Sequence, residues 1–236
     1  MKNGILASCM VLFFLYSITA NSKVPPTITK EITLEAFERV ALDNAFDVTI
    51  KYGLTQKVTI SGSDKIIDNI DFKIKNKMLV LDMKKHHRQN HRLKVEVIIP
   101  RLTEVQVNGS GSANFSNFPN FSNLVLEAHG SGDIDADEAL VINNNLKIIV
   151  SGSGSINIGK GTAKRSEVML DGSGSYEGRL LETNSTEVAV SGSGDATVHA
   201  TNHLEAKVTG SGSIYYKGNP NKVESHSDGS GDVESL

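Results

Sequence analysis

The sequence is poor in cysteine and in long apolar runs. Its single cysteine, Cys9, lies in an N-terminal segment that we expect to be removed, so the mature chain forms no disulfide. The longest apolar run, Met10 to Tyr16, is too short for a membrane-spanning helix, which needs about 20 apolar residues. No later run comes close, and no long helical pattern is present. We therefore expect neither a disulfide-stapled scaffold nor a helical membrane protein.

The N-terminus has the order of a secretory signal peptide. Lys2 precedes the apolar run, and small residues follow it up to Ala20, which is typical of a cleavage site. We predict that residues 1–20 form the signal, that residues 21–26 form a linker, and that the protein is exported to the periplasm or the cell surface.

The segment from Leu6 to Cys9 reads LASC and resembles a bacterial lipobox. A lipobox ends the apolar run, whereas most of the run follows Cys9 here. We therefore favour an ordinary signal peptide over a lipoprotein anchored through Cys9.

Strong positive charge is also absent. The formal net charge is −3, and it is unevenly divided. Residues 21–100 carry 14 Lys and Arg against 10 Asp and Glu, whereas residues 101–236 carry 9 against 17. The acidic second half excludes nucleic acid as the expected partner.

Glycine is abundant and periodic. Gly-Ser-Gly begins at residues 109, 130, 152, 172, 192, 210 and 229, so the separations are 21, 22, 20, 20, 18 and 19 residues. Flexible linkers have no such period, whereas a period near 20 is typical of a solenoid in which each repeat forms one coil. The sequence therefore predicts an all-β solenoid with coils of about 20 residues.

Apolar residues alternate around every triplet. Val188, Val190, Ala196 and Val198 share one parity with the two glycines of their triplet, as expected for strands with one buried face. Because both glycines fall on the buried parity, we predict that each triplet is a corner of the coil, where inward side chains would collide.

The opposite parity leaves a polar strip outside. We single out ten of its residues as binding candidates, because a row of hydroxyls suits a polyhydroxyl ligand. For any single serine, a solvated corner is the favoured interpretation. The ten candidates are Ser110, Ser131, Asp133, Ser153, Ser173, Ser193, Asp195, Ser211, Ser230 and Asp232.

Residues 27–100 lack the repeated triplet but also read as strands. Segments such as FDVTIKYG and LKVEVIIP alternate and are rich in β-branched residues. We predict one domain over residues 27–236, in which residues 27–100 supply N-terminal strands that cap the stack and residues 101–236 form the coils.

Two stretches carry a family resemblance: FERVALDNAFDVTIKYG, and VEVIIPRLTEVQVNGSGSANF followed by serial GSGD or GSGS coils. The chain resembles the family described as "putative auto-transporter adhesin, head GIN domain" over residues 27–236. The resemblance implies a right-handed parallel β-helix and a cell-envelope setting. The tripeptide that names the family is replaced here by Ser155, Ile156 and Asn157.

Two acidic motifs invite a metal or catalytic interpretation. GSGD ends in Asp133, Asp195 and Asp232, but no two of these lie on neighbouring coils, whereas Ca²⁺ needs six to eight oxygens together. In DIDAD, Asp135 and Asp137 join Asp133 on the outward parity, yet no basic residue is near to complete a lyase site and no nucleophile motif is present. We expect no metal, no cofactor and no enzyme.

Two further segments could bind a ligand. KKHHRQNHR, with His86, His87, Arg88, His91 and Arg92, could hold an anionic glycan or a metal ion, but its place between two strands favours a solvated hairpin tip. FSNFPNF spaces three phenylalanines by three residues. Their rings could stack on sugars, but we favour packing in the interior.

The sequence is best interpreted as a non-catalytic, exported, adhesin-like module that binds a glycan or another cell-surface component. The alternatives are a carbohydrate-active enzyme and a structural envelope protein with protein partners only. Homo-oligomerisation stays open.

Overall fold

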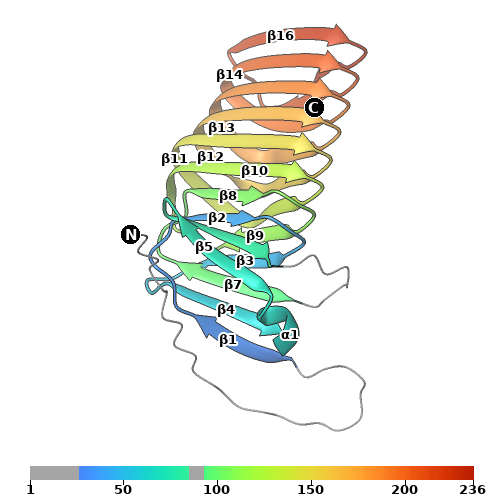
Figure 1. The fold of residues 1–236 in the computed structure, drawn as a ribbon. Coiled ribbons are helices and arrows are strands. Elements are labelled where there is room, and N and C mark those ends of the chain that lie inside the picture. Colours follow the sequence, from blue (N-terminus) through green and yellow to red (C-terminus); the bar gives the residue numbers. More distant parts are fainter. Residues whose placement is uncertain (1–26, 85–92) are drawn as a thin grey trace, which may run out of the picture.

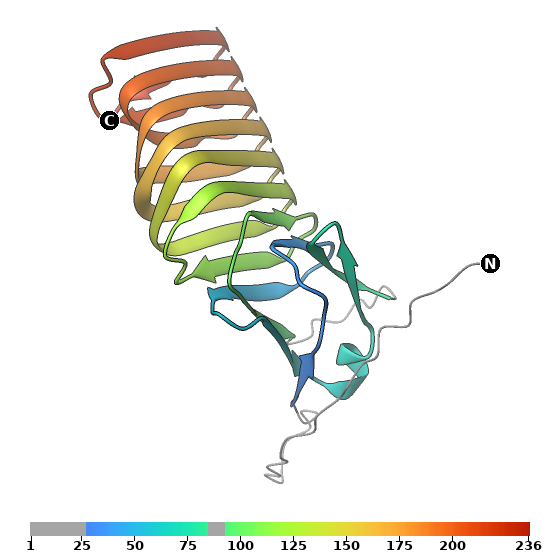
Figure 2. The same ribbon diagram turned by 90° about the vertical axis from the view of Figure 1, so that its left-hand side faces the viewer.

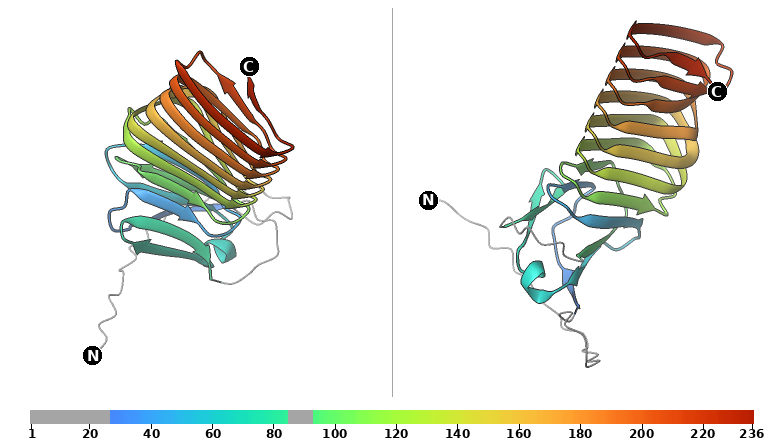
Figure 3. Two further views of the ribbon diagram at one scale, coloured as in Figure 1. Left: turned by 90° about the horizontal axis from the view of Figure 1, so that it is seen from above. Right: turned by 90° about the vertical axis from the view of Figure 1, so that its right-hand side faces the viewer.

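The computed structural model describes residues 27–84 and 93–236. The residues of the predicted signal peptide, Cys9 among them, and those of the predicted linker 21–26 lie outside the described residues. One 17-stranded sheet winds into a stack of coils of about 20 residues each, about seven turns long. Figures 1 and 2 show the coils stacked along one axis, with the N-terminal strands at one end of the stack, and Figure 3 gives two further views. The predicted all-β solenoid is confirmed.

The N-terminal part mixes antiparallel and parallel pairing. Strands β1 and β4, β4 and β7, and β5 and β6 pair antiparallel. The elements are β1 (Ile28–Ile32), β2 (Arg39–Leu42), β3 (Asp47–Tyr52), β4 (Lys57–Gly62), α1 (Asp64–Ile67), β5 (Ile70–Lys75), β6 (Met78–Met83) and β7 (Lys94–Ile99). No helix in the described residues is long and apolar enough to cross a membrane.

The triplet-bearing part pairs in parallel throughout. Its strands are β8 (Glu104–Val107), β9 (Ser112–Ser116), β10 (Phe121–Gly130), β11 (Asp133–Gly152), β12 (Ser155–Gly172), β13 (Ser175–Gly192), β14 (Ala196–Gly210), β15 (Ile214–Lys217), β16 (Lys222–Gly229) and β17 (Val233–Ser235). Residues at equivalent positions of successive coils lie in register, and we call such a row a file.

The core is built from inward-facing files. Val150, Leu170, Val190 and Val208 form one such file, and none is more than 3% exposed. Full burial of one such side chain stabilises by roughly 1.5–3 kcal/mol, so the alternation read from the sequence supplies much of the driving force for coiling.

The phenylalanines of FSNFPNF pack inside, as favoured from the sequence. Phe115, Phe118 and Phe121 are 0%, 8% and 3% exposed. Phe121 meets Phe115 and Phe118 with ring centroids 6.1 and 5.3 Å apart, and Tyr52 meets Phe118 edge-on at 6.0 Å. They are not a sugar-stacking platform.

The parallel stack extends two layers further toward the N-terminus than the triplets indicate, because β6 and β7 also pair in parallel with β2 and β3. β2 pairs in parallel with β8, and β3 with β9. Leu42 faces Val107 and Asp47 faces Ser112, so residues 43–46, read DNAF, lie opposite residues 108–111, read NGSG. Phe46 thus stands where later coils have their second glycine.

The glycine triplets are the points of closest approach between coils. The chain bends at each central serine, and the first glycine has a positive φ from Gly130 onward, for example 119° at Gly192. The carbonyl oxygen of Gly172 accepts the N–H groups of Ser193 and Gly194, at 2.8 and 3.1 Å. A Cβ at Gly192 would overlap that same oxygen.

This geometry corrects the reason given for the glycines. We attributed them to crowding on the concave side of a bend. The second glycines are indeed buried, but the first are only partly covered, and the atoms nearest to an added Cβ belong mainly to the backbone of the preceding coil. Coil-to-coil stacking is therefore the main constraint that excludes a side chain at both positions.

A polar file follows the triplets, which we call the post-triplet file: Asp47, Ser112, Asp133, Ser155, Ser175, Asp195, Ser213 and Asp232. No two carboxylates are neighbours in it. Ser155 donates both its N–H and its hydroxyl to Asp133 Oδ1, at 2.9 and 2.6 Å, and the N–H of Ser213 donates to Asp195 Oδ1 at 2.8 Å. The aspartates thus bond one coil to the next.

Replacing Gly192 by Ala tests the stacking constraint, with Ser193→Ala as the matched control in the same triplet. The Gly192→Ala change adds a Cβ against the Gly172 carbonyl at a positive φ, so we expect a loss of roughly 2–5 kcal/mol in the free energy of unfolding. Ser193→Ala should stay within about 0.5 kcal/mol. Urea denaturation measures both, and equal effects would contradict this account.

Replacing Asp133 by Ala tests the post-triplet file. It removes an acceptor that holds two donors of Ser155, so we expect a loss of roughly 1.5–3 kcal/mol. Asp133→Asn keeps an acceptor oxygen and should lose less. Asp228→Ala is the control, because the Asp228 side chain is exposed and makes no hydrogen bond or ion pair within the described residues. This variant should stay within about 0.5 kcal/mol. A loss as large at Asp228 would argue against a specific bond.

Candidate functional site

The seven central serines of the triplets are all exposed. Six of them follow the arrowheads of β10–β14 and β16, which line up along one edge of the stack (Figure 1), and Ser110 follows β8. Their hydroxyls make no hydrogen bond to another group of the protein within the described residues, although their N–H groups bond the preceding coil from Ser131 onward. The file Ser110, Ser131, Ser153, Ser173, Ser193, Ser211 and Ser230 is therefore a row of free hydroxyls.

The three GSGD aspartates have mainly structural contacts. Asp133 and Asp195 accept hydrogen bonds from the following coil, and the N–H of Asp232 lies 3.4 Å from Ser213 Oγ. Asp133 and Asp195 are three coils apart, about 14 Å at the parallel-strand spacing. One ion cannot bridge them.

The DIDAD carboxylates do not converge on one point. Asn157 donates to Asp135 Oδ1 at 2.8 Å, and Asn114 donates to Asp137 Oδ2 at 2.9 Å, while Asp133 holds Ser155. Each carboxylate is thus engaged by a neighbouring coil. The histidine-rich candidates His86, His87, Arg88, His91 and Arg92 lie outside the described residues and stay a prediction.

The structure adds a feature that the sequence did not suggest. Two adjoining hollows of about 460 and 340 Å³ share Glu177 and Arg179. Together they cross β11–β15, and we call them the axial groove. Its lining residues are Ala136, Asp137, Asn157, Ile158, Gly159, Ser175, Tyr176, Glu177, Arg179, Leu180, Asp195, Thr197, Tyr215 and Leu236.

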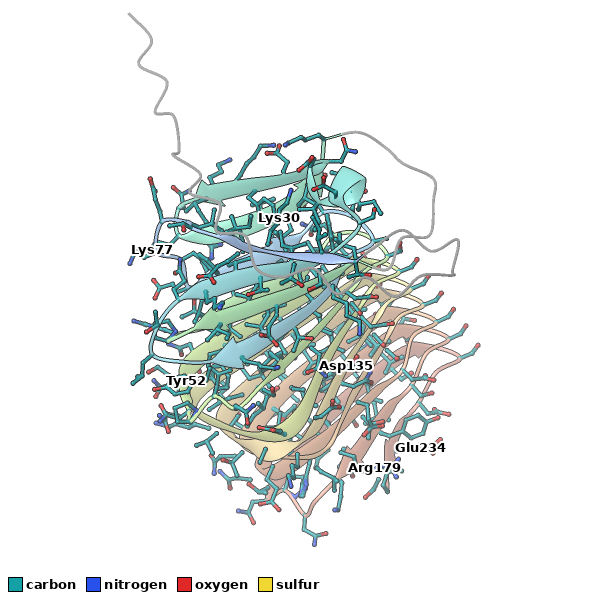
Figure 4. The ribbon with its side chains drawn as sticks, turned by 90° about the horizontal axis from the view of Figure 1, so that it is seen from below. Lys30, Tyr52, Lys77, Asp135, Arg179 and Glu234 are labelled. Atoms are coloured by element: carbon teal, nitrogen blue, oxygen red, sulfur yellow. The ribbon has the colours of Figure 1, made fainter. Side chains whose placement is uncertain are left out.

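The groove lies over the strands that come after the triplets. Its outward residues form the file Asp135, Asn157, Glu177, Thr197, Tyr215 and Glu234. Figure 4 shows Asp135, Arg179 and Glu234 on the same side of the stack. Beneath them, the side chain of Tyr176 turns inward, and burial raises the pKa of its phenol, so it is neutral.

The groove combines a cation, carboxylates and apolar surface. The Arg179 side chain is 55% exposed and its Nε lies 4.0 Å from Glu177 Oε1, so most of its donor fork is free. Leu180 and Leu236 are 52% and 57% exposed, and Tyr215 is half-buried. Donors, acceptors and apolar patches side by side suit a ligand with both hydroxyl groups and C–H faces.

Of the ten polar-strip candidates, the structure brings only Asp195 into this groove, where it joins Asp137 of the DIDAD motif. Arg179 and Tyr215 were missed because neither stands in a repeated motif. The signal that could have revealed them is positional: both lie on the outward parity of the strand after a triplet. Arg179 is five residues beyond Gly174, and Tyr215 is three residues beyond Gly212.

Comparison with known proteins agrees with this architecture. Residues 36–220 match the family "putative auto-transporter adhesin, head GIN domain". No curated protein is significantly similar in sequence.

Solved structures share the fold. A putative adhesin from Bacteroides fragilis is 25% identical with a TM-score of 0.82, over 91% of this chain and 98% of that one. One from Parabacteroides merdae is 21% identical with a TM-score of 0.72, over 89% and 96%. A "putative lipid binding protein" from Parabacteroides distasonis is 20% identical with a TM-score of 0.73, over 89% and 96%. Since the family match covers most of the sequence, this chain belongs to the head GIN domain family of putative auto-transporter adhesins.

Proposed function

We propose that this protein is a non-catalytic, exported binding module whose axial groove holds an extended carbohydrate. The observation that carries the proposal is that the two hollows of the groove, which share Glu177 and Arg179, together extend over five coils. At about 4.8 Å per coil, four spacings make a path of about 19 Å. Such a path accommodates several linked sugar rings better than a single small molecule.

The lining matches sugar chemistry. Hydroxyl groups both donate and accept hydrogen bonds, so they need the mixture of Arg179, Asn157 and Asp195 that the groove offers. The Tyr215 ring and the exposed Leu180 offer surface to the C–H faces of a sugar. The free guanidinium favours a carbohydrate that carries carboxylates, because Arg binds carboxylates with a bidentate fork.

Binding is favoured over catalysis by how the groove carboxylates are used. Glu177 Oε1 accepts the N–H of Arg179 at 2.9 Å, and Asp195 Oδ1 accepts that of Ser213 at 2.8 Å. Both therefore act as backbone acceptors, while glycosidases need a free carboxyl pair across the bond they cleave. A carbohydrate-active enzyme and a structural protein with protein partners remain the rivals.

The expected location of the protein also supports the proposal. Adhesins act outside the cytoplasm, which agrees with the signal peptide expected at residues 1–20.

We also propose that the coil is right-handed with its triplets at the corners, since parallel crossover connections are right-handed in about 98% of cases. The free serine file beside the post-triplet file would extend the polar surface available to a long glycan.

Substituting Arg179 by Ala tests the groove. We expect the affinity for the best ligand on an array of neutral and uronic-acid oligosaccharides to fall about 10- to 100-fold, since hydrogen bonds to charged groups contribute roughly 1.5–3 kcal/mol. Tyr215→Ala should reduce it several-fold. Isothermal titration calorimetry on the purified protein measures both.

Arg165→Ala is the matched control, because Arg165 is similarly exposed, at 58% against 55%, but pairs with Glu187 outside the groove. It should change the affinity less than twofold. Equal losses at both arginines would indicate nonspecific charge attraction. Phospholipid binding without glycan binding would favour a lipid ligand at Leu180 and Leu236, and turnover of a bound oligosaccharide would favour the enzyme.

A further inference from the structure

A second cluster of functional side chains lies away from the axial groove, on the outward face of β14 and β16. His203 and Glu205 are two residues apart on β14, and Glu224 faces Glu205 across the parallel ladder. The inward residues between them, Leu204 and Val223, also face each other. The register of two successive coils therefore brings one imidazole and two carboxylates to one surface point.

The donor atoms are close enough to share an ion. One ring nitrogen of His203 and one oxygen from each glutamate lie within 4.8 Å of one another. Zinc binds nitrogen and oxygen ligands at about 2.0–2.2 Å, which places ligand atoms about 3.5 Å apart in a tetrahedral site. The donors therefore need to close by no more than about 1.3 Å. Small rotations suffice for this, because both glutamates are exposed and His203 is only partly covered.

The charge pattern favours a cation at this point. Glu167, Glu187, Glu205 and Glu224 form one file, so four carboxylates follow one another up the stack. Lys147 lies 3.7 Å from Glu167, Arg165 lies 3.0 Å from Glu187, and Lys222 contacts Glu224.

Glu205 is the exception. It makes no ion pair within the part of the chain that the structure describes, although a carboxylate flanks it on each side in the file. His203 lies beside this unpaired carboxylate, and imidazole is the commonest metal-binding side chain in proteins.

We propose that His203, Glu205 and Glu224 form a surface site for a divalent transition-metal ion, with zinc the best match. Imidazole suits zinc, whereas calcium and magnesium prefer oxygen ligands alone. Three protein ligands leave at least one coordination position for water or another ligand. The site is independent of the carbohydrate proposal, because none of its residues lines the axial groove.

Zinc titration by isothermal titration calorimetry tests the site. The parent protein should carry His86→Ala, His87→Ala and His91→Ala, so that the histidine-rich segment cannot contribute. We expect one zinc ion per chain, and at least a tenfold loss of affinity in His203→Ala and in Glu205→Gln. Circular dichroism should be unchanged, since these side chains are on the surface.

His226→Ala is the matched control. His226 is an exposed histidine on β16 that faces Lys207 and does not belong to the cluster, so this variant should bind zinc within twofold of the parent. No zinc binding by the parent, equal affinity in His203→Ala, or an equal loss in His226→Ala would overturn the site. Calcium binding as tight as zinc binding would overturn the assignment of the metal and leave only an acidic patch.

Discussion

The structure depends on the close approach of successive backbones at the glycine triplets. There the Gly172 carbonyl accepts two N–H groups from the next coil, and the same contact recurs from Gly130 to Gly210. Backbone occupies the space that a Cβ would need. Because each triplet stacks directly on the one before, the register of every coil is set again once per turn, even though coil length varies between 18 and 22 residues.

Because the register is fixed, residues far apart in the sequence line up in files. A file of like charges is repulsive unless hydrogen-bond donors or opposite charges lie beside it. The post-triplet file does this by sequence: serines separate its aspartates, and two of the aspartates accept N–H groups from the next coil. The glutamate file does it with cations from neighbouring positions, such as Arg165 beside Glu187. The pairs are exposed and each contributes little, about 0–1 kcal/mol. Their effect is to remove repulsion that the register would otherwise impose.

The sequence predicts the structural features that recur in successive coils and misses those that occur only once. Coil length follows from the period of the triplets, and the inward file of Val190 follows from the parity of the apolar residues within each coil. The layer formed by β2 and β3 was missed because residues 43–46 replace the glycine triplet. Phe46 is tolerated there because no earlier triplet stacks beneath it.

The axial groove could not be derived from the sequence for a related reason. Its members come from several coils, and which residues share a file depends on register shifts, such as the one between Glu177 and Glu182. Asp195 was found because its motif repeats, whereas Arg179 belongs to no repeat. A serine file on an exposed edge offers hydrogen bonds that compete with water, each with a net contribution of roughly 0.5–1.5 kcal/mol. The groove adds apolar surface to such bonds, so affinity should come from the groove, with the serine file setting how a long ligand lies along the stack.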